Sequence, residues 1–424
     1  MGYTENLIDF IGKSTDCYHA VKTAKDRLDE NGFTELFEGD KWDVQSGGKY
    51  YVIRNSSSII AFEMPKKDFG AFMICASHTD SPSFKLKPDF EINTDGCIKL
   101  SVEGYGGMIM SSWLDRPLSI SGRIVTAKNG KVETKLVNID RDLLVIPSLA
   151  IHMSRDINKG YEFNIRRDMC PIASEKNGRI EDIIAENVGV DKEEILGFDL
   201  SLYNRMRGTV LGADGEYFSA PRIDDLQCMY STLEGFLNSE SDDNVTVFAA
   251  FDNEEVGSGT KQGAGSTFFP EVLKRISYLC GKNEEEYYMA VADSFMLSAD
   301  NAHAVHPNYQ DKTDPTNRPY INEGNVLKYN ASQKYTTDAN SAALVKYLCK
   351  KEKIKCQVFF NRSDMLGGST LGNILTGQVS IKAADIGLPQ LSMHSTYETA
   401  GCKDLDDMIT LMGSFYELGK EVQI

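Results

Sequence analysis

The sequence predicts an α/β fold with a mostly parallel central sheet flanked by helices and with an inserted β-rich domain. Apolar runs of the length of buried strands occur at 58–64, 71–76, 245–251, 289–292 and 356–360. Helix-length segments at 226–237 and 340–351 lie between the later runs. Such alternation is typical of a mostly parallel sheet, whose strands are buried on both faces. Polar clusters follow several of these runs directly, at the strand ends where open α/β sheets place their functional sites.

The chain is predicted to begin with an amphipathic helix. Ala20, Val21, Ala24 and Leu28 recur at helical spacing, and Gly32 follows as a suitable residue for a helix end. We therefore expect helix up to about residue 32.

A different pattern occupies the middle of the chain. Runs of alternating polar and apolar residues at 118–126 and 131–137 flank Asn129-Gly130, which is a strong signal for a tight β-hairpin. The sequence therefore predicts a β-rich domain at 91–214, inserted into a larger domain formed by residues 1–90 and 215–424.

Composition excludes several classes of function. The formal net charge of −17 repels nucleic acids and anionic lipid surfaces, and no apolar run is long enough to span a membrane. The nine cysteines form no C-x-x-C pair, and the N-terminus has no basic segment of an export signal. We expect a cytoplasmic protein with reduced thiols that binds neither nucleic acid nor membrane.

Two of the polar clusters that follow predicted strands carry residues suited to catalysis. In His78-Thr79-Asp80 the carboxylate is placed to orient the imidazole, so that its other nitrogen can face a metal ion. In Asp252-Asn253-Glu254-Glu255, adjacent glutamates point in different directions, so one can ligate a metal while the other reaches a water molecule. Taken alone, this acidic cluster also fits a solvated turn.

Further carboxylate and imidazole groups lie elsewhere in the chain, at Asp224, Asp300, His303, His306 and His394. Spacing alone does not decide whether His303 or His306 is a ligand. Carboxylate and imidazole ligands without cysteine suit zinc, manganese or cobalt in a hydrolytic site, and they exclude a thiolate structural zinc site.

Over nearly its whole length the chain resembles the M18 metalloaminopeptidases, the aspartyl aminopeptidase family. The matching segments, in chain order, are His78-Thr79-Asp80-Ser81-Pro82, Tyr105-Gly106-Gly107, Trp113-Leu114-Asp115-Arg116, residues 146–152, Arg222-Ile223-Asp224, residues 252–258, residues 298–309 and Met393-His394-Ser395. The resemblance implies a fold of the two-metal exopeptidase type.

The resemblance also implies a role for each matching residue. His78, Asp224 and Asp300 would bind one divalent ion, and Asp224, Glu255 and His394 the other, both ions being zinc with manganese or cobalt as alternatives. Asp80 would orient His78, and Glu254 would be the general base that takes a proton from the attacking water.

Other implied features concern assembly and specificity. In the family, the histidine that matches His152 reaches a neighbouring subunit's active site, and the inserted domain forms dimers within a tetrahedral dodecamer. Lys328 lies where the family places a lysine near the acidic side chain of the substrate's first residue. Because five residues already fill the ligand positions, His303 and His306 are expected to line the substrate pocket or to support the ligands, and His303 is taken as a substrate-binding residue. Two positions differ from many members: Asp225 replaces Asn, and Tyr397 replaces Arg, which would alter the charge of the wall facing the substrate.

The sequence thus predicts an aminopeptidase that removes acidic residues, Asp or Glu, from the N-termini of peptides. Two alternatives remain. One is a related two-metal exopeptidase that prefers neutral residues, and the other is a scaffold that has kept the fold without the activity. The retained Glu254 argues against a scaffold, because a site that only binds metal needs no second glutamate beside its ligand.

Overall fold

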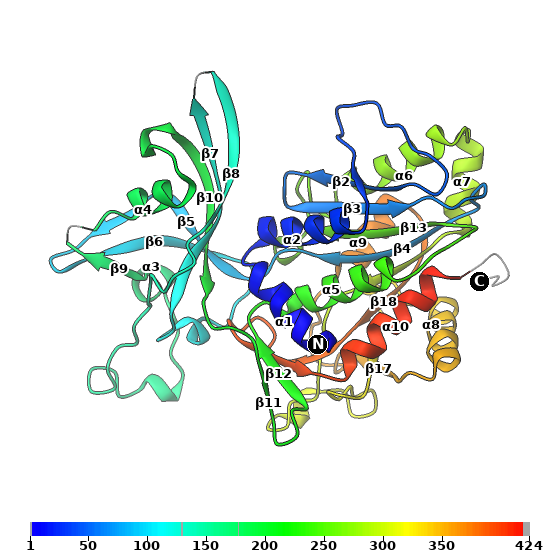
Figure 1. Cartoon of the computed structure of the whole chain (residues 1–424). Helices are drawn as coiled ribbons and strands as arrows, with labels where there is room; N and C mark the ends of the chain where they lie inside the picture. The colour runs from blue at the N-terminus through cyan, green and yellow to red at the C-terminus, as the bar shows by residue number, and fades with distance from the viewer. Residues whose placement is uncertain (1, 129, 177, 419–424) are drawn as a thin grey trace.

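The central element of the fold is a nine-stranded sheet, seen in a computed structural model that describes residues 2–128, 130–176 and 178–418 (Figure 1). In spatial order its strands are β1 (Thr34–Glu35), β2 (Lys49–Arg54), β3 (Ser58–Glu63), β13 (Val245–Phe251), β4 (Phe72–His78), β14 (Phe295–Ala299), β18 (Lys382–Gly387), β16 (Asn325–Tyr329) and β17 (Cys356–Phe360). Strands β13, β4, β14 and β18, in the middle of the sheet, are mutually parallel. Antiparallel pairs occur nearer the edges, at β2–β3, β3–β13 and β16–β18.

Helices cover both faces of this sheet, because successive residues of its strands point to opposite sides and are apolar on both. In β3, Ile59 and Ala61 belong to the core on one face, whereas Ile60 and Phe62 belong to the core on the other. The first face is covered by α1 (Tyr3–Lys13), α2 (Cys17–Glu30), α5 (Ile223–Leu237), α8 (Ala339–Glu352) and α10 (Asp404–Tyr416). The second is covered by α6 (Phe268–Leu279), α7 (Glu284–Asp293) and α9 (Leu371–Gln378). The predicted α/β class is confirmed.

The predicted N-terminal helix is two helices. The Asp16 side chain accepts hydrogen bonds from the backbone N–H groups of Tyr18 and His19 and so caps the second helix, which separates it from the first. Gly32 follows this second helix with a positive φ of 80°, which glycine adopts without strain.

The strand predicted at 289–292 is wrong, because this apolar run lies in the helix α7. Asn283 and Glu286 form a capping box at the start of that helix, and Tyr287, Ala290 and Val291 recur on its buried side at helical spacing. The strand follows immediately as β14. Asp293 therefore ends a helix, whereas Asp300 comes directly after the strand.

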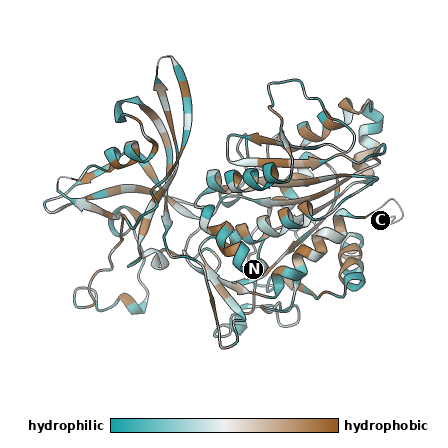
Figure 2. Cartoon of the chain, in the orientation of Figure 1, coloured by the Kyte–Doolittle hydropathy of each residue, from teal (hydrophilic) through white to brown (hydrophobic). Residues whose placement is uncertain are grey.

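A separate six-stranded sheet lies to the left of the central sheet in Figure 1. Its strands, in spatial order, are β8 (Lys131–Asn138), β7 (Leu118–Lys128), β10 (Ile195–Asn204), β5 (Ser83–Asn93), β6 (Cys97–Tyr105) and β9 (Ile172–Glu175), and neighbouring strands are antiparallel. With α3 (Ile165–Asp168) and α4 (Ile180–Val188) it encloses its own core of buried apolar residues. Figure 2 shows hydrophobic residues distributed along the strands of this sheet. Strands β7 and β8 form the predicted hairpin, although Asn129 in its turn lies outside the described residues.

A third, five-stranded sheet links the two larger parts. Its order is β11 (Thr209–Leu211), β12 (Tyr217–Ala220), β20 (Glu398–Gly401), β19 (Pro389–Leu391) and β15 (Ala302–His303). The hairpin β19–β20 carries the loop that contains His394, so this sheet fixes one side of the site described below. Among the described residues, no helix combines the length and the apolar character needed to cross a membrane.

Candidate metal centre

Polar side chains from five segments of the chain converge at the carboxyl ends of the central parallel strands. His78 ends β4, and Asp300 directly follows β14. Glu255 lies in the short helix Glu254–Val256, which comes after β13. Asp224 stands at the start of α5, and His394 lies in the β19–β20 loop. The fold therefore brings all five predicted metal ligands together.

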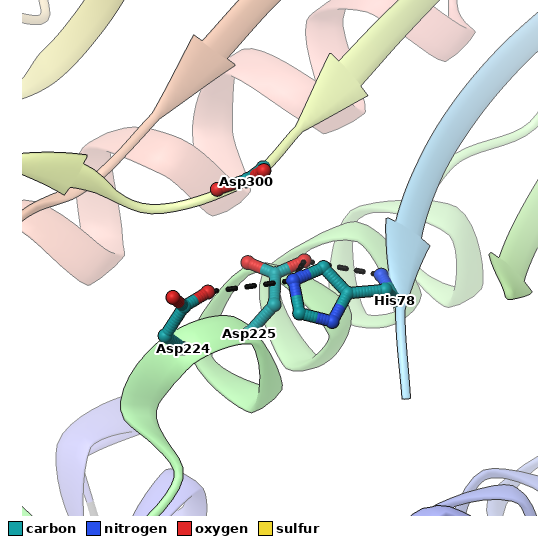
Figure 3. Close-up of side chains that lie close together, drawn as sticks. All are labelled: His78, Asp224, Asp225 and Asp300. Carbon is teal, nitrogen blue, oxygen red and sulfur yellow. Dashed lines mark hydrogen bonds and ion pairs between the residues drawn. The ribbon is translucent and has the colours of Figure 1, made fainter. Parts of the chain in front are cut away.

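Two groups of possible ligand atoms share one residue. His78, Asp224, Asp225 and Asp300 offer atoms that all lie within 4.8 Å of one another, and so do Asp224, Glu255 and His394. Figure 3 shows the first group, in which the four side chains come from three separate segments.

The Asp224 carboxylate lies between the two histidines. Its Oδ1 is 3.4 Å from His78 Nε2, and its Oδ2 is 3.3 Å from His394 Nε2. His394 Nε2 is also 3.4 Å from Glu255 Oε2. Each oxygen of Asp224 thus faces a different group of ligands, which is the geometry that a bridging carboxylate requires.

The charges and unpaired atoms of this cluster fit divalent cations. Asp224 Oδ1, Asp225 Oδ1 and Glu255 Oε1 are buried carboxylate oxygens without a hydrogen-bond donor. Burial raises the pKa of Asp300, Asp225 and Glu255, and repulsion from Asp224 adds to the rise in each of the three. Bound cations would supply both the missing partners and the missing positive charge.

Asp80 holds His78 and the loop after β13 in place. The His78 Nδ1 lies 3.1 Å from the Asp80 carbonyl oxygen and 3.4 Å from its Oδ1, so Nε2 is the nitrogen that faces the other carboxylates. The Asp80 carboxylate also accepts hydrogen bonds from the backbone N–H groups of Glu254 and Glu255. Although burial acts in the opposite direction, these interactions hold the pKa of Asp80 below its usual value.

The Tyr105-Gly106-Gly107 segment acts on three different residues of the centre. The Tyr105 hydroxyl donates a 2.6 Å hydrogen bond to Asp80 Oδ2, and the Gly107 carbonyl oxygen lies 2.5 Å from His394 Nδ1. Gly106 has a positive φ of 71°, and a Cβ atom there would come within 3.1 Å of the Glu255 Cβ. The segment therefore holds His394 directly and His78 through Asp80, and only glycine fits at position 106 against Glu255 without strain.

Replacing Tyr105 with Phe is expected to lower metal affinity or activity by about 10- to 100-fold, because Asp80 loses a donor that fixes its orientation. The measurement is the Zn²⁺ affinity of metal-stripped protein, together with kcat. Tyr397→Phe is the matched control, because its hydroxyl donates to the Arg207 carbonyl instead. Equal values for the Tyr105→Phe variant and the unmodified protein would exclude this role.

Glu398 is a buried positioning residue that the sequence did not indicate. Its Oε2 accepts a 3.0 Å hydrogen bond from the Asp224 N–H, and its Oε1 accepts a 2.6 Å hydrogen bond from the His394 N–H. Burial raises the pKa of Glu398 to about 8, and the nearby Asp224 carboxylate acts in the same direction. The only available signal was a glutamate four residues after His394, which by itself is unspecific.

Glu254 lines the same cavity as the candidate ligands. Burial raises its pKa to about 8, and the Asp300, Asp80 and Asp224 carboxylates add to the rise while His78 opposes it. The backbone N–H of Glu254 donates a hydrogen bond to Asp80 Oδ1, which holds the residue in place. Glu254 belongs to neither group of ligand atoms.

The predicted substrate-binding residues line this cavity too. Lys328 is fully buried, and its Nζ lies 3.2 Å from Asp300 Oδ1. His303 lies nearer the surface, with its ring centroid 6.2 Å from that of Phe359. His306 is not among the lining residues of this cavity but lines an adjacent one that shares His303.

His152 is not brought to the centre of its own chain. It lies in an exposed turn at 151–153 between β8 and β9, beside Leu149, Ile151 and Met153, which are 55%, 48% and 75% exposed. A run of exposed apolar side chains of this kind is typical of a protein–protein contact.

Neither of the two residues that depart from the family pattern lines the cavity of the candidate ligands. Asp225 is completely buried, and its Oδ2 accepts a hydrogen bond from the backbone N–H of His78. The Tyr397 hydroxyl donates a hydrogen bond to the Arg207 carbonyl oxygen. The expectation of an altered wall charge is therefore wrong for Asp225, because the side chain lies beneath the histidine within the first group.

Comparison with known proteins gives consistent similarities. A family model described as aminopeptidase I zinc metalloprotease (M18) matches residues 10–416. A protein from Clostridium novyi (strain NT), named probable M18 family aminopeptidase 2, is 44% identical over 428 residues, which cover 98% of this chain and 99% of the relative. A protein of the same name from Pseudomonas aeruginosa (strain UCBPP-PA14) is 37% identical over 422 residues, with 97% of each chain covered.

Solved structures have the same fold. A chain in the cryo-EM structure of the Ape4 and Nbr1 complex superposes with a TM-score of 0.94 at 35% identity, covering 97% of this chain and 84% of the other. The structure of the S. cerevisiae mApe1 dodecamer gives a TM-score of 0.85 at 28% identity, covering 97% and 95%. The similarity therefore extends over both the central sheet and the six-stranded sheet.

Proposed function

The chain belongs to the M18 family of aminopeptidase I zinc metalloproteases, and from this premise we propose that it holds two divalent ions and prefers peptides that begin with Asp or Glu. The observation that carries the two-metal proposal is the Asp224 carboxylate, whose two oxygens face His78 and His394 respectively. The family membership predicted from the sequence is confirmed, and with it the activity of a metalloaminopeptidase.

His78, Asp224 and Asp300 would hold the first ion, and Asp224, Glu255 and His394 the second. The family description supports zinc, and the same ligand types accept manganese or cobalt. When bound, such ions polarise the scissile carbonyl and lower the pKa of a water molecule.

Glu254 is proposed as the general base. Its carboxylate would take a proton from the attacking water and return it to the amine that leaves. Its position beside the ligand Glu255, in the wall of the same cavity and outside both groups of ligand atoms, supports this role.

The proposed preference for acidic residues rests on Lys328, with His303 in the wall of the same cavity. Lys328 is a buried cation in the cavity wall, and a nearby carboxylate of the substrate would be attracted to it. The Asp300 carboxylate neutralises part of the charge of Lys328. Coordination of Asp300 to the bound ion would weaken this ion pair and leave Lys328 more able to attract the substrate's carboxylate.

The proposed function is tested by release of Asp, Glu, Leu and Lys from matched chromogenic amides. Each is assayed before and after chelation, and again with zinc, manganese or cobalt restored. We expect loss of activity on chelation, recovery with metal, and faster release of Asp and Glu. Equal or faster release of Leu would favour a neutral-residue exopeptidase, and no release with any metal would favour a scaffold.

The six-stranded sheet and the connection between β8 and β9, which contains His152, are proposed to form contacts between subunits in a homo-oligomer, such as a dodecamer. The mApe1 structure is described as a dodecamer, and the exposed apolar residues around His152 suit burial in such a contact. His152 would then enter the active site of a neighbouring subunit and donate a hydrogen bond to the developing oxyanion.

Replacing His152 with Ala is expected to lower kcat by about 10² to 10³, with metal content and oligomer size unchanged, because one oxyanion donor is lost. Steady-state kinetics, elemental analysis and size-exclusion mass measure these three quantities. Mixed oligomers of His152→Ala and Glu254→Gln subunits should regain activity, because some sites then receive an intact histidine and an intact base. Mixed oligomers that stay inactive would exclude transfer of His152 between subunits.

A cytoplasmic location is proposed as well. All nine cysteines are free thiols, and several are buried in the cores. Such thiols suit a reducing compartment.

A further inference from the structure

The first group of ligand atoms contains one carboxylate that the family resemblance does not assign to a metal. Asp225 lies beside Asp224 and belongs to the group formed with His78 and Asp300 (Figure 3). Its side chain is completely buried. A charge in this position therefore needs a partner inside the protein or a bound cation.

The hydrogen bonds of Asp225 account for only one of its two oxygens. Oδ2 accepts a 3.1 Å hydrogen bond from the His78 N–H and lies 4.0 Å from His78 Nε2. Oδ1 is buried without a donor. An asparagine would serve the His78 N–H equally well through its carbonyl oxygen, so this hydrogen bond does not explain the negative charge.

The lysine that contacts this group pairs with Asp300 and not with Asp225. Lys328 forms its ion pair with Asp300 Oδ1 at 3.2 Å. His78 is shared among Asp80, Asp224 and Asp225. The described part of the centre thus offers an ionised Asp225 no cation of its own, and a divalent ion held by His78, Asp224 and Asp300 would balance its charge.

We propose that the Asp225 carboxylate contributes to the first metal position, so that this chain binds an ion there more tightly than a chain with asparagine would. The contribution is either direct ligation through the free Oδ1 or close electrostatic attraction, and both require the negative charge. The proposal rests on the proposed two-metal centre. It makes the two positions unequal, because Asp225 belongs to the first group and not to the second.

The test uses two backgrounds in which one position is disabled. His394→Ala leaves only the first position, and Asp300→Asn leaves an intact second position. Metal-stripped protein is titrated with Zn²⁺ against a chelating indicator. In the His394→Ala background, Asp225→Asn is expected to weaken Zn²⁺ binding by about 10- to 100-fold. In the Asp300→Asn background, the same change is expected to leave binding unaltered.

Asp404→Asn is the matched control. Asp404 is a buried aspartate that accepts backbone hydrogen bonds from Asn322 and Gly324 and lies in neither group of ligand atoms. It should leave both affinities unchanged. Asp225→Ser provides a second variant should the asparagine variant fold poorly, and thermal unfolding of metal-free protein is compared for all variants.

Each outcome decides one statement. Unchanged Zn²⁺ binding in the His394→Ala background would reduce Asp225 to an acceptor for the His78 N–H and overturn the inference. Equal weakening in both backgrounds would indicate general damage and overturn it as well. Absence of Zn²⁺ binding by the unmodified protein would instead overturn the proposed metal centre itself.

Discussion

Replacing Glu254 with Gln is expected to lower kcat by about 10² to 10⁴ while both metal ions remain bound, because the change removes the proton acceptor and keeps the size of the side chain. Glu254 lines the cavity but belongs to neither group of ligand atoms, so metal binding does not depend on its charge in the way that catalysis does. The measurements are steady-state kinetics on an acidic aminoacyl amide and metal content by elemental analysis.

The control for Glu254→Gln is Glu255→Gln, at the neighbouring position. Glu255 belongs to the second group of ligand atoms and lies 3.4 Å from His394 Nε2. Its replacement should lower metal content together with activity. A Glu254→Gln protein with normal turnover would refute the assignment of the base, whereas loss of metal from that variant would make Glu254 a ligand.

Replacing Asp224 with Asn is expected to abolish binding of both ions and to lower activity by more than about 10²-fold, which exceeds the 10- to 100-fold effect typical of residues that only support ligands. The reason is that Asp224 is the one residue present in both groups of ligand atoms of the described chain. Asparagine keeps the shape of the side chain but offers only one oxygen, so it cannot bridge the two ions as a carboxylate does. Zn²⁺ titration of metal-stripped protein measures the result.

Comparison with single-position variants sharpens this prediction. His394→Ala should release one ion and retain the other, whereas Asp224→Asn should release both. Tight binding of one ion to the Asp224→Asn protein would mean that Asp224 serves a single position, and the bridging arrangement would be wrong. Unfolding temperature in the absence of metal separates loss of ligation from loss of fold.

Part of the fold followed from local pattern, and part could not. The runs at 58–64, 71–76, 245–251 and 356–360 form strands as predicted, because they are apolar, short and bounded by turn residues. The run at 289–292 is equally apolar but lies in the helix α7. A run of four residues fits either structure, and here the capping box at 283–286 decides for the helix.

The candidate site shows the same division. The sequence predicted His78, Asp224, Glu255, Asp300 and His394 because their residue types match a metal centre and their order matches the family. It gave no role to Glu398, because the contact of that side chain with Asp224 and His394 exists only once β20 pairs with β19. It also misplaced Asp225, because the direction of a side chain at the start of α5 is set by packing and not by its neighbours in sequence.

By itself, the sequence determined which chemical groups this protein can bring to a metal centre and in which order they follow the strands of an α/β sheet. Residue type, strand pattern and family resemblance are properties of the chain alone. Only the tertiary structure decided which oxygen of Asp224 faces which histidine and that Asp225 is buried beneath His78. Those relations join segments far apart in the chain, and their distances are set by the pairing of β4, β13 and β14 and by the packing of α5 against them.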